Sequence, residues 1–421
     1  MCSSGGERNA GRGLDRLPTG DCALQGPGGT GLCIIERCRF LASTERKQQV
    51  EHIGFTSHKA RNFMNAPVEY RPDLETPSVS EQETIRSLES LFVDMAMTVA
   101  EKEGHAHRAV HAKGQGLFTA RLTVFNDLPE ELRQGLFAEP GQYAAYIRLS
   151  SPPAEQLSDA VSTPRALALK VLGVSGERVE GGDEKHSQDF LMVNGPSFTT
   201  PGPDGFLRNF RVLATTTEKA PRAKAALSKV LRGVENTLEK IGGGSGSIKQ
   251  MGGQPQIHPL GETFFSQVPF LYGRYIAKFS LAPVSRNLIE LDGQAVGDSQ
   301  DAQREAVHHS ISTLASPAEW ELRVQLCRDV EKMPLEDASV EWSESISPFV
   351  AVARVVVERQ AGWDGEKSLQ LEDRIAFSPW HALAAHRPLG AINRARRIVM
   401  AASRRFRSEF NRCPIHEPAG L

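Results

Sequence analysis

Residues 107–116 read His-Arg-Ala-Val-His-Ala-Lys-Gly-Gln-Gly, and the interpretation of the whole chain starts from this stretch. His111 is followed at once by a small residue, a lysine and two glycines, and Arg108 stands three positions before it. Histidine is the side chain most easily set up for proton transfer near neutral pH. The glycines let the backbone run close to something flat or bulky. The stretch predicts a catalytic histidine; the alternative is a histidine at a strand edge beside a glycine turn.

The composition narrows the class of protein. The chain has 421 residues, of which 40% are hydrophobic, and its formal net charge is −2. This length suits one large domain or two ordinary ones. The near-zero charge argues against nucleic acid as a partner. No apolar run approaches the ~20 residues that span a bilayer, so we expect no integral membrane segment.

The cysteines bear on the cellular compartment. They are sparse, at positions 2, 22, 33, 38, 327 and 413, and do not form a disulfide framework. Those near the start lack the close Cys-x-x-Cys pairing of a zinc site. No basic start followed by an apolar core and a cleavage site is evident. We therefore expect a reduced, cytoplasmic protein.

Three segments differ in their composition. Residues 1–65 are dense in glycine and lack a hydrophobic period, so we expect a disordered or loosely ordered head. Residues 66–410 are expected to form the folded domain, and residues 411–421 a tail. Within the domain, the glycine-rich residues 242–256 predict a flexible surface loop.

Hydrophobic spacing predicts helices at both ends of the domain. Ser80 and Glu83 have the spacing of a capping box, and the following helix should end near Gly104. One face of this helix is apolar, formed by Ile85, Leu88, Phe92, Met95 and Val99. Residues 380–410 are predicted to be helical and basic. This second helix is either solvated or in contact with an acidic partner or a membrane surface.

Between the helices, short apolar runs predict strands. They comprise residues 142–149, 166–172, 188–193, 273–282, 320–327 and 349–357. Leu322, Val324 and Leu326 alternate with polar residues, as in a half-buried strand. Separated strands with long excursions between them favour an α+β fold, an antiparallel β-barrel with surrounding helices.

The stretch around His111 resembles the distal-histidine segment of heme catalases, Arg-x-x-His-Ala-Lys-Gly-x-Gly. Further segments resemble catalases in the same order, namely 148–150 (Arg-Leu-Ser), 163–170 (Thr-Pro-Arg-Ala-Leu-Ala-Leu-Lys), 189–198 (Asp-Phe-Leu-Met-Val-Asn-Gly-Pro-Ser-Phe) and 340–355. The resemblance spans roughly residues 75–400. It implies a catalase-like barrel, and residues 66–410 then form a heme domain.

The resemblance also implies roles for distal residues. His111 would move a proton between the two oxygens of a peroxide, as general base and then acid. Ser150 would hold the imidazole by a hydrogen bond, and Asn194 would donate an amide hydrogen to the peroxide. The alignment of Asn194 is open by one position, and its alternative is a turn residue before Gly195-Pro196.

The implied cofactor is heme b. Arg108 and Arg148 match positions that bind the heme propionates, for which the arginine fork is well suited, and Arg387 is a further candidate for this role. Phe206 is expected to contact the cofactor as well.

The proximal side departs from the family. Catalases ligate iron by a tyrosine within Arg-x-x-x-Tyr-Pro, whereas residues 374–381 read Arg-Ile-Ala-Phe-Ser-Pro-Trp-His. Anchored on Arg374, the tyrosine position is Ser378; anchored on Leu389-Gly390, it is His381. Imidazole is the better iron ligand, so His381 is the candidate metal ligand. Arg374, which offsets the charge of the tyrosinate in catalases, then lacks that partner.

These features predict a heme-dependent, catalase- or peroxidase-like oxidoreductase that consumes hydrogen peroxide or organic peroxides. Two alternatives remain open. One is a heme enzyme that converts lipid or organic hydroperoxides without true catalase turnover. The other is a non-catalytic relative that binds heme or another ligand. The expected partner is a small-molecule peroxide, and the chain is compatible with a homo-oligomer.

Overall fold

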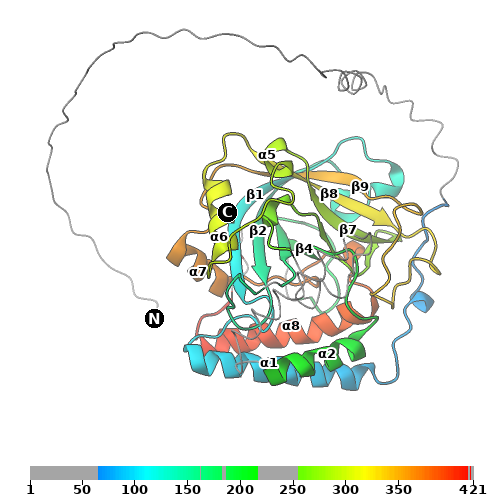
Figure 1. The fold of residues 1–421 in the computed structure, drawn as a ribbon. Helices are drawn as coiled ribbons and strands as arrows, with labels where there is room; N and C mark the ends of the chain where they lie inside the picture. Colours follow the sequence, from blue (N-terminus) through cyan, green and yellow to red (C-terminus); the bar gives the residue numbers. More distant parts are fainter. Residues whose placement is uncertain (1–64, 162, 183–185, 217–254, 416–417, 419–421) are drawn as a thin grey trace, which may run out of the picture. The chain divides into compact units, whose positions relative to one another are not determined.

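Nine antiparallel strands form the sheet at the centre of the fold. The computed structural model describes residues 65–161, 163–182, 186–216, 255–415 and 418. The strands are β1 (Lys113–Val124), β2 (Gln142–Ser151), β3 (Ala166–Leu172), β4 (Ser187–Val193), β5 (Phe264–Phe265), β6 (Phe270–Tyr272), β7 (Tyr275–Pro283), β8 (Ala318–Leu326) and β9 (Val350–Val357). Their order is β5-β4-β3-β2-β1-β9-β8-β7-β6, and β5 also pairs with β7. That pairing closes eight strands into a barrel, with β6 added beside β7 (Figure 1).

Side-chain alternation sends apolar residues into the barrel. Ala145, Ile147 and Leu149 of β2 belong to the main hydrophobic core, in register with strands β1 and β3. The residues between them, including Tyr146 and Arg148, lie on the outer face. The predicted strands are confirmed, and each predicted boundary lies within two residues of the observed one. The outer face of β1 to β4 is the wall on which the candidate site is built.

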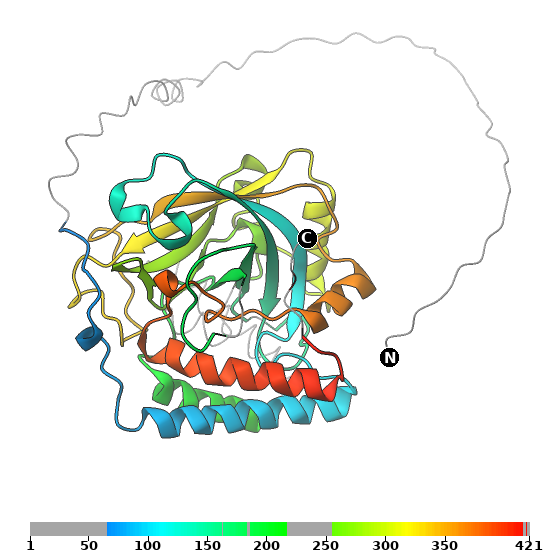
Figure 2. The same cartoon turned by 180° about the vertical axis from the view of Figure 1, so that it is seen from behind.

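Helices cover parts of the barrel. They are α1 (Glu81–Glu103), α2 (Pro203–Thr216), α5 (Arg286–Ile289), α6 (Ala302–Ser312), α7 (Gly365–Arg374) and α8 (Gly390–Phe410). Short 3-10 turns are η1 (Pro72–Leu74), η2 (Glu130–Leu132), η3 (Gly135–Phe137), η5 (Pro259–Gly261) and η6 (Ala384–His386). Helices α1, α2 and α8 pack on one another in one layer beside an end of the barrel (Figures 1 and 2). None of the helices in the described ranges is long and apolar enough to cross a membrane.

The first predicted helix is confirmed as α1, and its apolar face is buried against α2 and α8. It ends at Gly104, which adopts the left-handed conformation with φ of 71°. The predicted capping box is wrong, because Ser80 makes no side-chain cap hydrogen bond. Glu81, the first residue of the helix, is instead drawn into an ion pair with Arg394.

The second predicted helix is correct only from residue 390 onward. Residues 375–383 are irregular, and only the short turn η6 precedes α8. Pro379 and Pro388 disfavour helix here, since proline lacks an amide donor and restricts the residue before it. The predictions for residues 1–64 and for most of 242–256 lie outside the described residues.

Arg394 of α8 ties three elements together. Its guanidinium donates to Glu75 after η1, to Glu81 of α1 and to Glu336 of the loop before β9, at 2.7 to 3.0 Å. Its side chain is 21% exposed, and those of Glu81 and Glu75 are 4% and 11% exposed. This arginine of the basic helix therefore pairs with acids of its own chain.

We predict that Arg394→Ala lowers the free energy of unfolding by about 3 kcal/mol, because it leaves part-buried carboxylates without a cation. Chemical denaturation measured by circular dichroism tests this. Arg286→Ala is the control, because Arg286 is 91% exposed in its pair with Glu290. The control should leave the stability nearly unchanged. An equal, small effect of both substitutions would contradict the assigned role of Arg394.

Candidate functional site

His111 lies in the turn just before β1, at the edge of the outer barrel face. Its φ of 56° is left-handed, which is uncommon for a residue other than glycine. The next residue, Ala112, donates its amide to the carbonyl of Pro153. Nδ1 of His111 is buried and has no hydrogen-bond partner among the described residues. A buried ring nitrogen that is left unpaired is costly, which makes this atom a candidate to meet a ligand.

The surroundings of His111 keep its imidazole neutral. Burial, together with the positive charges of Arg148 and Arg396, lowers the pKa of His111 to about 3. The ring therefore has a free lone pair at neutral pH and can accept a proton.

The other predicted distal residues do not join His111 through hydrogen bonds. Ser150 is buried on β2, but within the described part of the chain no hydrogen bond links its hydroxyl to His111. Asn194 Oδ1 accepts from the amide of Arg165 at 2.9 Å, and Asn194 Nδ2 donates to Glu262 Oε1 at 2.9 Å. The side-chain amide expected to contact a peroxide thus connects the ends of two strands.

The two arginines expected to bind propionates converge on one carboxylate, that of Glu372 in α7. Arg148 Nε donates to Glu372 Oε1 at 2.6 Å, and Arg108 Nη1 forms an ion pair with Glu372 Oε2. Arg407 of α8 donates to the backbone carbonyl of Glu372 at 2.6 Å. We call Arg108, Arg148 and Arg407 the arginine cluster. Burial and the charge of Arg407 lower the pKa of Arg148 to about 9.

A glycine of the opening stretch makes room for this contact. A side chain at Gly114 would meet Glu372 Oε1 at 2.7 Å and the indole of Trp363 at 2.7 Å. The flat or bulky group expected beside the glycines is therefore part of this chain, formed by Glu372 and Trp363. Glu372 was not among the predicted site residues, and nothing in its local sequence distinguishes it.

Of the remaining predicted cofactor residues, Arg374, the last residue of α7, is exposed, whereas Arg387 and Phe206 have partners elsewhere. Arg387 pairs with Glu75 at 3.2 Å, and its guanidinium lies 5.0 Å from the ring centre of Tyr70. Phe206 packs in the aromatic cluster of α1 and α2, 5.5 Å from Phe210. These contacts account for the positions of Arg387 and Phe206 without a cofactor.

His381 is held by a buried ionic network on the outer face of β3 and β4. Its Nδ1 lies 3.0 Å from Asp189 Oδ2, and Lys170 Nζ lies 2.9 Å from Asp189 Oδ1. Burial raises the pKa of Asp189, but Lys170, His381 and hydrogen bonds outweigh it and lower the pKa. Asp189 and Lys170 both contact Nδ1 of His381, Lys170 Nζ at 3.2 Å. In the tautomer in which Nδ1–H donates to Asp189, the lone pair of His381 lies on Nε2.

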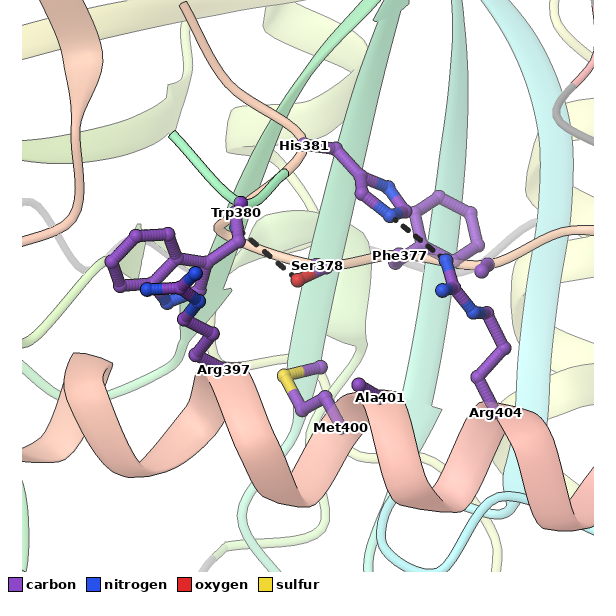
Figure 3. Close-up of a pocket in the computed structure, with 10 residues that line it drawn as sticks. Phe377, Ser378, Trp380, His381, Arg397, Met400, Ala401 and Arg404 are labelled. Atoms are coloured by element: carbon purple, nitrogen blue, oxygen red, sulfur yellow. Dashed lines mark hydrogen bonds between the residues drawn. The ribbon is translucent and has the colours of Figure 1, made fainter. Parts of the chain in front are cut away.

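Nε2 of His381 faces a small pocket between the irregular segment and α8 (Figure 3). Arg404 Nη1 lies 3.4 Å from it. The pocket has a volume of about 60 Å³ and is lined by Gly181, Ala376, Phe377, Ser378, Trp380, His381, Arg397, Met400, Ala401 and Arg404. Ser378, the other candidate for the tyrosine position, accepts a hydrogen bond from the Trp380 amide. The pocket is much smaller than the 300–1,000 Å³ typical of ligand sites, so this site is closed.

Sequence comparisons identify no relative: no family model matches the chain, and no curated protein matches it. Solved structures do match. Catalase A from Saccharomyces cerevisiae superimposes with a TM-score of 0.51 at 16% identity, over 82% of this chain and 69% of that one.

Two other solved structures give the same result. A fungal catalase has a TM-score of 0.50 at 16% identity, and a bacterial catalase 0.50 at 15%. The chain spans 66% and 63% of their lengths. At such low identity the similarity establishes the architecture alone. The chain thus has the fold of the heme catalases, an antiparallel eight-stranded β-barrel with surrounding helices.

Proposed function

We propose that this protein is a cytoplasmic heme protein that consumes hydrogen peroxide or an organic hydroperoxide. His111 would be its acid–base group and His381 its iron ligand. The observation that carries the proposal is the buried, neutral imidazole of His111, whose Nδ1 lacks a partner among the described residues. The catalase fold supports it. The cytoplasmic location is supported by the free thiols of Cys327 and Cys413.

The residue types around the site are those that would hold heme, and the pocket of about 60 Å³ beside His381 would have to open to admit it. Metal-binding histidines commonly donate the N–H of their second ring nitrogen to a carboxylate, and Asp189 lies 3.0 Å from Nδ1 of His381. Arg108 and Arg148 are cations suited to propionates. Heme b, when bound, supplies the redox-active iron that oxygen–oxygen bond cleavage requires.

The protein's own contribution to the proposed reaction would be the transfer of one proton between the two peroxide oxygens. A neutral His111 can take the proton from one peroxide oxygen at Nδ1 and return it to the departing oxygen. Arg148 restrains the turn, because its Nη2 donates to the carbonyl of His111 at 2.9 Å. Its positive charge also disfavours a protonated imidazole, which promotes the return of the proton.

The ligand bears on the class of reaction. A phenolate disfavours reduction of iron more than an imidazole does. Ligation by His381 would therefore favour peroxidase-type or hydroperoxide-rearranging reactions over disproportionation of hydrogen peroxide. Direct comparison of hydrogen peroxide with an organic hydroperoxide as substrates would separate these two enzymatic hypotheses.

A second candidate function is a ligand-binding protein without turnover. It is favoured by the pairing of Arg108 and Arg148 with Glu372 and by the small volume beside His381. A Soret band in the purified protein, combined with peroxide consumption, supports the enzyme. A Soret band without consumption supports the second candidate. Absence of a Soret band after reconstitution with ferric heme would refute both heme-based forms.

Replacing His111 by alanine should lower peroxide turnover by roughly 10²-fold or more, the usual scale for a positioned acid–base group. Initial rates of peroxide loss at equal heme content provide the measurement. His309→Ala is the matched control, since His309 lies exposed on α6. Unchanged turnover in His111→Ala would remove the catalytic interpretation.

The pH profile should reflect the low pKa of His111. The base form is present above a pKa of about 3 and is lost as pH falls through it. We therefore expect kcat/KM for peroxide to show no fall attributable to this group between pH 8 and about pH 4. The profile should be recorded only where circular dichroism shows folded protein. A decline centred near the ordinary histidine value of about 6.5 would show that His111 is not held neutral.

Ligation by His381 predicts a spectroscopic effect of its carboxylate partner. Asp189→Asn should make the His381 imidazole a weaker electron donor, because the negatively charged hydrogen-bond partner is lost, and should raise the reduction potential of the iron. His381→Ala should change the electron paramagnetic resonance spectrum of the heme-loaded protein. His386→Ala provides a control, because His386 Nε2 accepts from the amide of Leu136 in the core. Identical spectra and heme contents in the wild type and His381→Ala would exclude His381 as ligand.

A further inference from the structure

We infer that Glu372 competes within the molecule for the arginines that would bind the heme carboxylates. Heme uptake then requires α7 to release this side chain. The inference rests on the proposed function and adds a regulatory contact to it. Its basis is the paired state of Arg108 and Arg148, which the family resemblance did not predict.

The contact has the chemistry of a bound carboxylate ligand. Two guanidinium groups share the oxygens of Glu372, one at each oxygen. The side chains of Glu372, Arg108 and Arg148 are 10%, 16% and 4% exposed. Ion pairs in such surroundings are strong relative to surface pairs, and a ligand carboxylate must displace the resident one.

Helix α7 has few other anchors. Only Ser368 and Glu372 are buried along its ten residues, and Leu369 is 51% exposed. Leu371 packs only partly against the outer face of the barrel. The other described contacts of α7 are polar, namely Asp373 to His105 at 3.0 Å and the carbonyl of Glu372 to Arg407 at 2.6 Å. Loss of the carboxylate contact would therefore weaken the attachment of the helix, because little apolar area opposes its release.

The same contact reaches the segment that carries His381. Arg108 Nη2 also donates to the carbonyl of Ile375 at 2.9 Å, directly after α7. The side chain of Phe377 lies between two cations, 5.9 Å from Arg108 and 5.7 Å from Lys170, measured to the ring centre. Release of Glu372 would therefore loosen one end of the segment that closes the pocket beside His381 (Figure 3).

Titration of the apo protein with ferric heme, followed at the Soret band, tests the competition. Glu372→Gln keeps the size of the side chain and removes its charge. We expect Glu372→Gln to bind heme about tenfold or more tightly than the wild type. Heme dimethyl ester, whose carboxylates are blocked, should gain no affinity from the substitution.

The matched control is Asp373→Asn. Asp373 is the next residue of α7, and its carboxylate contacts His105 at 3.0 Å instead of the arginine cluster. This variant removes the same charge from the same helix and should bind heme as the wild type does. Glu372→Asp, which keeps the charge on a shorter side chain, should have an affinity between those of the wild type and Glu372→Gln.

A readout without heme examines the contact itself. Amide hydrogen exchange across residues 365–374 of the apo protein should become faster in Glu372→Gln and stay unchanged in Asp373→Asn. Unchanged exchange in Glu372→Gln would overturn the inference, because the helix would not depend on the contact.

The outcomes separate the inference from the proposed function. Equal heme affinities of the wild type and Glu372→Gln would overturn the competition and leave the proposed heme function intact. An equal gain for the dimethyl ester would also overturn it, since the effect would not involve carboxylates. Absence of a Soret band in the wild type and in every variant would overturn both the competition and the proposed function.

Discussion

The buried network of Lys170, Asp189 and His381 organises the site. Transfer of such groups from water costs several kcal/mol each, and only close pairing offsets that cost. The network attaches the irregular residues 375–383 to the barrel, aided by the amide of Asp189, which donates to the carbonyl of His381 at 2.9 Å.

Beside this network, on the outer face of the barrel, the buried charge of Arg148 is compensated by its acceptors. Arg148 is almost fully buried, and its desolvation is tolerable because Glu372 and the His111 carbonyl accept from it. The same positive charge helps to hold His111 neutral. Arg148 therefore contacts both the carboxylate of Glu372 on α7 and the backbone of His111. Loss of the Glu372 charge without a replacement would leave the arginine cluster uncompensated.

Local pattern predicted the fold well. The strands follow from alternation, as in Ala145, Ile147 and Leu149, because side-chain period alone decides which face enters the barrel. Helix α1 and its end at Gly104 follow from spacing and a single glycine. The irregular segment before α8 was mistaken for helix because its hydrogen-bond partners lie on β4, nearly 200 residues earlier in the chain. No local period records such a partner.

In the candidate site, too, the sequence identified residues but not the partners that they contact. The resemblance to catalases located Arg108, Arg148, His111 and His381 in the chain, but it could not predict what each side chain contacts. An arginine fork binds any carboxylate of suitable geometry, so the tertiary structure decides whether a propionate or Glu372 occupies it. Glu372 meets these arginines because the packing of α7 places it there, which its neighbours in sequence do not encode. A fold shared with catalases is therefore compatible with a different control of the same arginines, because a single acidic side chain can alter which carboxylate they bind.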